Sequence, residues 1–226
     1  MDFTSATFWA ALGSIILANI VLSGDNAVVI ALAARALPPH QQKKAIFWGS
    51  AAAIVMRIVL TLIAVKMLGL PYLKLAGGLA LLYIGANLMS DEEEQHDHAA
   101  KPIGVAAAVR TILVADLVMS LDNVLAVAAA AQGNTVLLII GLAVSIPLIV
   151  FGSTLILKVM ERLPVIIVAG AALLGWLAGE MMLTDPAIHG WFGEVGENVV
   201  RAGGVTGAVL VVIVGKLLQG RAKRRA

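Results

Sequence analysis

The sequence contains no cysteine and few charged residues, which make up 13% of its 226 residues. Without cysteine there can be no disulfide, zinc–cysteine site, iron–sulfur cluster or thiol catalysis. The composition is 60% hydrophobic and includes several apolar runs near twenty residues, which excludes a soluble domain and predicts an integral membrane protein in a lipid bilayer. The formal net charge is only +2, and the basic residues lie near the ends of the apolar runs, which argues against nucleic-acid binding.

The apolar runs predict an all-α, polytopic membrane protein that forms a single transmembrane domain over residues 1–226. A polar connector at about 90–103 and a basic tail at 220–226 interrupt and end the apolar pattern. The seven expected transmembrane helices are residues 8–36, 45–68, 70–89, 104–131, 135–157, 165–183 and 202–219.

Lysine and arginine gather in the loops on one side of this arrangement, and the positive-inside rule makes that side cytoplasmic. With seven crossings, the N-terminus is expected outside and the C-terminus in the cytoplasm. The basic residues on the cytoplasmic side are Arg35, Lys43, Lys44, Lys101, Lys158, Arg162 and those of the tail.

The first apolar run carries an aspartate, Asp25, near its middle. A carboxylate at bilayer depth costs roughly 3 kcal/mol on insertion scales, so it usually faces a partner, a cavity or an ion. Asn19, Ser23 and Asn26 fall at i, i+4 and i+7, which is one face of a helix. The run therefore presents a ladder of oxygen donors, although an aspartate paired only for packing is the simpler alternative.

The same pattern recurs in the second half of the chain, within residues 116–131. This second copy again places a polar residue, a serine and an asparagine on one helix face, with an aspartate just before the asparagine. The corresponding pairs are Asn19 and Asp116, Ser23 and Ser120, Asp25 and Asp122, and Asn26 and Asn123.

The likeness between the two halves extends beyond these motifs, to a first repeat at about 8–89 and a second at about 104–183. Each repeat holds three expected spans, and an odd number makes the second enter the membrane from the opposite face, as in the inverted repeats of secondary transporters. The helix at 202–219 is an unmatched addition. Further corresponding pairs are Gly49 and Gly141, Lys66 and Lys158, Pro71 and Pro164, Gly77 and Gly170, and Asn87 and Glu180.

The repeat would bring Asp25 and Asp122 together across a pseudo-twofold axis, where two carboxylates repel unless a divalent cation or a shared proton lies between them. Carboxylate, amide and hydroxyl oxygens are hard ligands that suit Mg²⁺, Ca²⁺ or Mn²⁺. Protonation of one aspartate would also ease the return of an empty carrier. The candidate metal ligands are Asp25, Asn26, Asp122, Asn123, Asp116 and Asn19, with Ser23, Ser120 and the sulfur of Met119 as accessory contacts.

Arg57 is a basic residue inside an expected span, and Ile149 occupies its place in the second repeat. It is expected either to neutralise a carboxylate when no ion is bound or to form a structural ion pair. Asn87 and Glu180 would line access paths on opposite faces or simply lie at the membrane interface. Gly24, just before Asp25, would allow the first span to unwind. The second copy has Leu121 in the corresponding place before Asp122, which argues against the same break in both halves.

The segments V-L-S-G-D-N-A-V-V-I-A at 21–31 and D-L-V-M-S-L-D-N-V-L-A-V-A at 116–128 resemble the two signature segments of the TerC family, in its compact form without soluble domains. The family takes its name from tellurium resistance, and its members are associated with manganese export within a larger superfamily of inverted-repeat exporters. The resemblance implies efflux of Mn²⁺ across the plasma membrane, with Asp25, Asn26, Asp122 and Asn123 as the metal site. We also expect no enzymatic activity and no prosthetic group, and the sequence leaves a homo-oligomer open.

Two other functions are compatible with paired intramembrane aspartates. An aspartyl protease would use a carboxylate pair to activate water, but the paired asparagines suit coordination better than acid–base chemistry. A membrane scaffold that assists insertion or metal loading of other proteins would tolerate Asp25→Asn, whereas a cation carrier would not.

Overall fold

The computed structural model describes residues 6–21, 23–67, 70–94, 104–130, 134–193 and 195–223. All regular elements within these residues are helices, which confirms the all-α prediction. They are α1 (Ala6–Val21), α2 (Gly24–Arg35), α3 (Pro39–Met67), α4 (Leu73–Glu94), α5 (Val105–Ala130), α6 (Thr135–Arg162), α7 (Val165–Leu183), α8 (Pro186–Phe192) and α9 (Glu197–Lys223).

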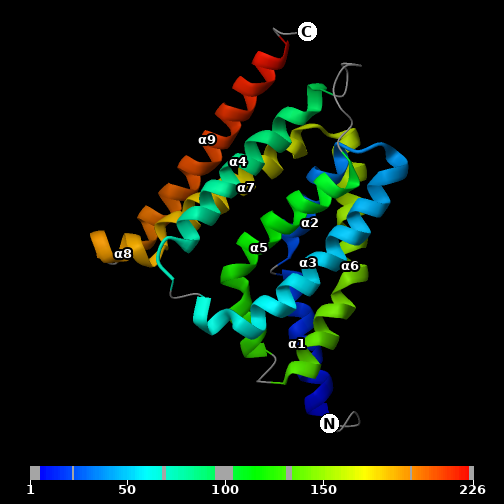
Figure 1. Cartoon of the computed structure of the whole chain (residues 1–226), viewed down its shortest axis with the longest axis vertical. Coiled ribbons are helices and arrows are strands. Elements are labelled where there is room, and N and C mark those ends of the chain that lie inside the picture. Colours follow the sequence, from blue (N-terminus) through cyan, green and yellow to red (C-terminus); the bar gives the residue numbers. More distant parts are fainter. Residues whose placement is uncertain are drawn as a thin grey trace.

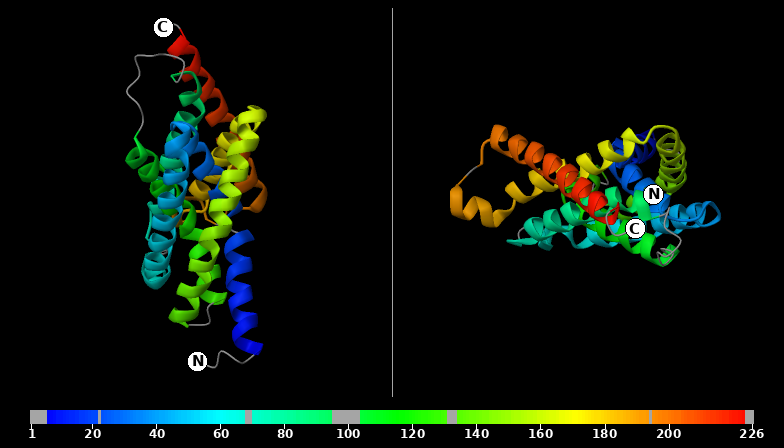
Figure 2. Two further views of the ribbon diagram at one scale, coloured as in Figure 1. Left: turned by 90° about the vertical axis from the view of Figure 1, so that its right-hand side faces the viewer. Right: turned by 90° about the horizontal axis from the view of Figure 1, so that it is seen from above.

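The helices form two groups that lie beside each other (Figures 1 and 2). One group contains α1, α2, α3, α5 and α6, in which α3 packs against α5 and both α1 and α2 pack against α6. The other contains α4, α7, α8 and α9, in which α7 and α9 pack along each other and both contact α4. The start of α1 and the end of α9 lie at opposite ends of the long axis (Figure 1).

Among the described residues, four helices are long and apolar enough to cross a membrane, within α3, α6, α7 and α9. Shorter apolar segments lie in α1 and α4, at Phe8–Leu17 and Leu73–Met89. Large apolar side chains such as Trp48, Phe151 and Leu217 are exposed on the helix surfaces, as expected for side chains that face lipid. The protein is therefore a multi-pass membrane protein, and the count of seven spans stays a prediction.

The expected first span at 8–36 is two helices rather than one. α1 ends at Val21, α2 begins at Gly24, and Ser23 between them has a non-helical backbone with φ −117° and ψ 7°. Serine and glycine both weaken a helix interior, and Asp25 falls in the first turn of α2, where the helix dipole favours a negative charge. The second motif has Leu121 in place of the glycine and lies in one continuous helix, α5.

Several other helix ends also differ from the predicted spans. The second expected helix begins earlier, at Pro39, because proline is well tolerated in a first helical turn. The expected connector after residue 90 is helical as far as Glu94, and the short α8 was not predicted. α6 continues to Arg162, and α9 begins at Glu197 instead of 202.

One helix contact occurs twice, at corresponding places in the two halves. Gly49 of α3 faces Ile112 of α5, so closely that a Cβ added at the glycine would lie 2.5 Å from the isoleucine Cδ1. Gly141 of α6 faces Ile15 of α1, and a Cβ added there would lie 2.5 Å from the isoleucine Cγ2. The two glycines correspond in the sequence, and each isoleucine lies four residues before the first polar residue of its motif.

α9 is attached to α7 by a seam of glycines: Gly175 and Gly179 on α7, and Gly203 and Gly207 on α9. A Cβ added at Gly179 would collide with the backbone oxygen of Gly203, and one at Gly207 with that of Gly175. Both helices thus carry small residues four apart, which permits the close backbone contact typical of membrane helix pairs. We call these four residues the glycine seam.

Candidate functional site

The centre of the first helix group is organised around the guanidinium of Arg57 on α3. Its Nε donates to Ser120 Oγ at 3.0 Å, and its Nη1 donates to Asn19 Oδ1 at 2.5 Å and to Ser23 Oγ at 2.7 Å. Its Nη2 forms an ion pair with Asp116 Oδ1. We call Arg57 and these four partners the arginine clasp.

The four partners of Arg57 are the first polar residue and the serine of each motif copy. Within each copy the serine also donates to the polar residue one turn earlier: Ser23 Oγ to Asn19 Oδ1 at 3.3 Å, and Ser120 Oγ to Asp116 Oδ2 at 3.2 Å. The clasp therefore joins equivalent positions of two segments that lie almost a hundred residues apart in the chain. No pattern in the sequence indicated which residues Arg57 would contact.

The clasp is almost completely removed from solvent. Asn19 and Ser120 are 0% exposed, Arg57 is 1% exposed, Ser23 is 2% exposed and Asp116 is 5% exposed. A buried guanidinium is tolerated only when its charge is paired and its donors are satisfied. One carboxylate balances the charge, while an amide oxygen and two hydroxyls take the other bonds.

The second part of the first motif lies on α2, next to the clasp along the chain. Asp25 is partly buried, and its Oδ1 accepts the backbone N–H of Asn26 at 2.7 Å. Asn26 is 2% exposed, yet neither its Oδ1 nor its Nδ2 has a hydrogen-bond partner among the described residues. Buried amide groups are nearly always bonded, so the amide oxygen of Asn26 is a possible metal ligand that the described residues do not use.

The equivalent residues of the second motif lie on α5. Asn123 is partly buried, whereas the side chain of Asp122 lies outside the described residues. Met119 is 7% exposed and belongs to the apolar core. In the part of the chain that the structure describes, no group of three His, Cys, Asp or Glu side chains could hold a metal ion, so the metal set built on both aspartates stays a prediction.

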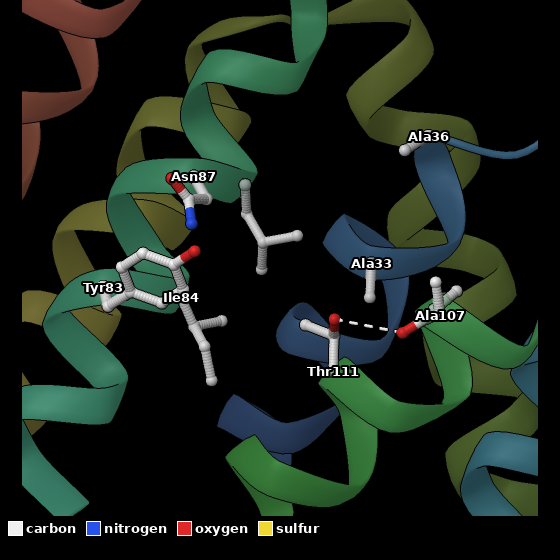
Figure 3. A pocket seen from close by; sticks show the side chains of 9 residues that line it. Ala33, Ala36, Tyr83, Ile84, Asn87, Ala107 and Thr111 are labelled. Atoms are coloured by element: carbon white, nitrogen blue, oxygen red, sulfur yellow. Dashed lines mark hydrogen bonds between the residues drawn. The ribbon is translucent and has the colours of Figure 1, made fainter. Parts of the chain in front are cut away.

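A cavity of about 320 Å³ opens between α2, α4 and α5 (Figure 3). Asn87, which the sequence suggested for an access path, lines it together with Tyr83, and Thr111 lies across from them on α5. The cavity lies near the end of α2 and the start of α5. A predicted cytoplasmic loop follows α2, and the predicted cytoplasmic connector at about 90–103 precedes α5. Glu180, the counterpart of Asn87, lies elsewhere: its Cγ would be 3.1 Å from a Cβ added at Gly204, in the contact between α7 and α9.

Asp185 is a polar residue whose role sequence reasoning missed. It is 0% exposed and accepts backbone N–H groups from Ala187 at 2.7 Å, Tyr72 at 2.9 Å and Leu75 at 3.0 Å. It thereby caps α8 and ties the start of α4 to the end of α7. The Asp-Pro pair is a local signal for a helix start, but it says nothing of the contact with α4.

The pKa of Asp185 reflects two opposing effects. Burial raises it, because a carboxylate loses hydration. The backbone hydrogen bonds from Ala187, Tyr72, Leu75 and Lys74 outweigh burial and hold the pKa below its ordinary value of 3.8. Asp185 is therefore ionised at neutral pH and stabilises the fold as a carboxylate.

A bundle of apolar helices with a charged, hydrogen-bonded cluster in its interior defines a multi-pass integral membrane protein. The model of the Integral membrane protein TerC family matches residues 4–224, almost the whole chain, so the protein belongs to this family. This confirms the resemblance seen in the two motif segments.

Related membrane proteins occur in Bacillus subtilis (strain 168). The membrane protein YjbE is 47% identical over 167 residues, covering 74% of this chain and 76% of YjbE. YkoY is 26% identical over 81% of this chain and 62% of its own length, and YceF is 30% identical over 62% of this chain and 58% of its own length. No solved structure matches the chain.

Proposed function

We propose that the protein exports a divalent metal ion, Mn²⁺ above others, across the plasma membrane. The observation that carries this proposal is that Arg57 contacts equivalent residues of both motif copies, Asn19 and Ser23 from one and Asp116 and Ser120 from the other. Both copies therefore face one buried polar centre, as a midplane site between two repeats requires.

The proposed ligands extend from this centre to the Asp-Asn pairs of the two copies. The buried amide of Asn26 supports the proposal, because its oxygen accepts no hydrogen bond from any described residue and could bind an ion. Oxygen-only donor sets favour Mn²⁺, Mg²⁺ or Ca²⁺ over softer metals, and the family resemblance selects Mn²⁺ among them. The proposed ligand set is Asp25, Asn26, Asp122, Asn123, Asp116 and Asn19.

The proposed topology is two inverted three-span repeats plus α9, with the N-terminus outside. In this topology α1 and α2 together make the first crossing. The repeated contact of Gly49 with Ile112 and of Gly141 with Ile15 supports it, because an inverted repeat places equivalent residues in equivalent contacts. The glycine seam supports α9 as an addition to the second repeat.

The cavity between α2, α4 and α5 is the proposed cytoplasmic approach to the centre. Thr111 lies five residues before Asp116 on α5, which is about 7.5 Å along a helix axis. The ion would be captured from this side, one repeat would rock against the other, and the ion would leave outside. Asn87 would offer it an amide oxygen on the way.

The test is cellular manganese in a metal-sensitive host loaded with Mn²⁺. Wild type should lower cellular manganese, while Asp25→Asn and Asp122→Asn at equal membrane abundance should not. Glu197→Gln, which removes an exposed carboxylate on α9, is the control and should behave as wild type. If both aspartate variants export normally, export through this site is wrong and a scaffold role explains the protein better.

Coupling to protons is part of the same proposal, because Asp25 and Asp122 without an ion between them would retain a proton. In sealed vesicles, an imposed pH gradient should then drive manganese flux. Flux that ignores the gradient would rule out proton exchange and leave the export proposal standing.

A further inference from the structure

The acceptors of Arg57 are four oxygen atoms of the kinds that bind a hard cation. They are the amide oxygen of Asn19, the hydroxyls of Ser23 and Ser120, and the carboxylate of Asp116. The side chain of Asn19 presents its oxygen to the guanidinium, while its buried amide nitrogen has no partner in the part of the chain that the structure describes. A divalent ion therefore cannot bind these oxygens while the Arg57 guanidinium occupies them.

We propose that Arg57 is a tethered cation, which occupies these oxygens when no metal ion is bound and is displaced when the ion enters. This inference rests on the proposed function and adds to it a competition between one side chain and the cargo. Arg57 therefore acts in the ion-free protein and is not itself a ligand of the ion.

The electrostatic consequence concerns the return of the empty carrier. The pair of Arg57 and Asp116 is neutral, so the ion-free clasp carries no net charge through the reorientation. Without the guanidinium, Asp116 would keep an unpaired charge in a centre where it is 5% exposed. Ile149, the counterpart of Arg57 on α6, is an apolar residue, so the second repeat supplies no replacement.

Two transport modes separate this role from a purely structural one. Net efflux requires the empty carrier to return, whereas exchange of Mn²⁺ for labelled Mn²⁺ across the membrane of loaded proteoliposomes does not. For Arg57→Met we expect net efflux to fall at least tenfold while exchange continues at half the wild-type rate or more. Arg57→Lys retains a cation and should keep most of the net efflux.

Ion binding provides a second readout that does not depend on transport. Arg57→Met lacks the competing guanidinium and should bind Mn²⁺ at least tenfold more tightly than wild type. The shift of the thermal unfolding temperature with Mn²⁺ concentration in detergent measures this affinity. Arg57→Lys makes fewer hydrogen bonds and should bind Mn²⁺ more tightly than wild type but less tightly than Arg57→Met. If Arg57→Met does not accumulate, the affinity of Arg57→Lys for Mn²⁺ decides whether Arg57 competes with the ion or has a purely structural role.

The inference is overturned if a folded Arg57→Met binds Mn²⁺ no more tightly than wild type, or if it loses exchange together with net efflux. It is also overturned if Arg57→Lys binds Mn²⁺ as wild type does or more weakly. If wild type itself neither binds nor carries Mn²⁺, the proposed function fails, which is a different result from any of these.

Discussion

The arginine clasp and the glycine seam connect helices in opposite ways. The clasp joins three helices and the serine before α2 through one ion pair and three uncharged polar side chains, all buried. The seam joins α7 and α9 by bringing two backbones together, without any charge. Inside a membrane, hydrogen bonds and close packing are two of the means of holding helices together.

The difference suggests which part of the molecule moves. Hydrogen bonds to a guanidinium can be replaced by bonds to another cation, so the clasp can exist in two states. Close backbone contacts have no alternative partner, because any separation of α7 from α9 forfeits the packing. We therefore expect α7 and α9 to stay together while the helices around Arg57 rearrange.

The largest effect is expected when the clasp loses its carboxylate. Asp116→Asn leaves Arg57 buried without a counter-charge, which should cost about 3–5 kcal/mol of stability. The double variant Asn19→Asp with Asp116→Asn moves the carboxylate to the equivalent place in the other motif copy and should recover most of the loss. Thermal unfolding in detergent measures both, and a double variant as unstable as Asp116→Asn would contradict the equivalence of the two copies.

The seam is tested by adding a side chain where two backbones meet. Gly207→Leu would force α9 away from α7 and should cost about 1–3 kcal/mol through overpacking. Gly220→Leu on the same helix is the matched control, because nothing lies within 4 Å of a Cβ added there. Unfolding midpoints that fall equally for both variants would show that the seam has no special role.

Asp185 is a third kind of helix connection, in which backbone N–H groups stabilise a buried carboxylate. Its pKa is lowered in the folded protein, so its contribution is present above pH 3.8 and is lost as the pH falls through the lowered value. Asp185→Ala should cost about 1–2 kcal/mol at pH 7, as the loss of a helix cap does, and less at pH 3. Thermal unfolding of wild type and Asp185→Ala at pH 7 and pH 3 tests this prediction. A difference in stability that is equal at the two pH values would refute it.

The smallest effect is expected for the two hydroxyls of the clasp. Ser23→Ala and Ser120→Ala each remove one acceptor of Arg57, which should cost about 0.6 kcal/mol, the average for such bonds between membrane helices. The two costs should agree, because the serines occupy equivalent places. A large effect of one serine alone would indicate that the two copies hold Arg57 unequally.

Much of this architecture could be predicted from the sequence, because the signals are local. Apolar runs predicted membrane helices, and the recurring motif predicted that Asn19 corresponds to Asp116 and Ser23 to Ser120. Gly24 indicated where the first helix would be interrupted, and Leu121 why α5 would stay continuous. These features depend on the helix period and on backbone preferences.

The contacts across the bundle could not be predicted, because they depend on how distant helices pack. Arg57 was recognised as a buried cation, but its partners follow from the packing of α3 against α5 and from the position of Ser23 between α1 and α2. Asp185 has a local signal for α8, whereas its bonds to Tyr72 and Leu75 join segments more than a hundred residues apart. The seven residues of α8 are too few for a periodic pattern to be recognised.

The most direct test of the central claim is the number of Mn²⁺ ions bound per chain, measured by electron paramagnetic resonance on purified wild type, Asp25→Asn, Asp122→Asn and the control Glu197→Gln. If both motif copies form one site, wild type and the control bind one ion, and each aspartate variant loses it. Two ions per chain, each lost in only one variant, or unchanged binding in both aspartate variants, would contradict a single centre built from the two copies.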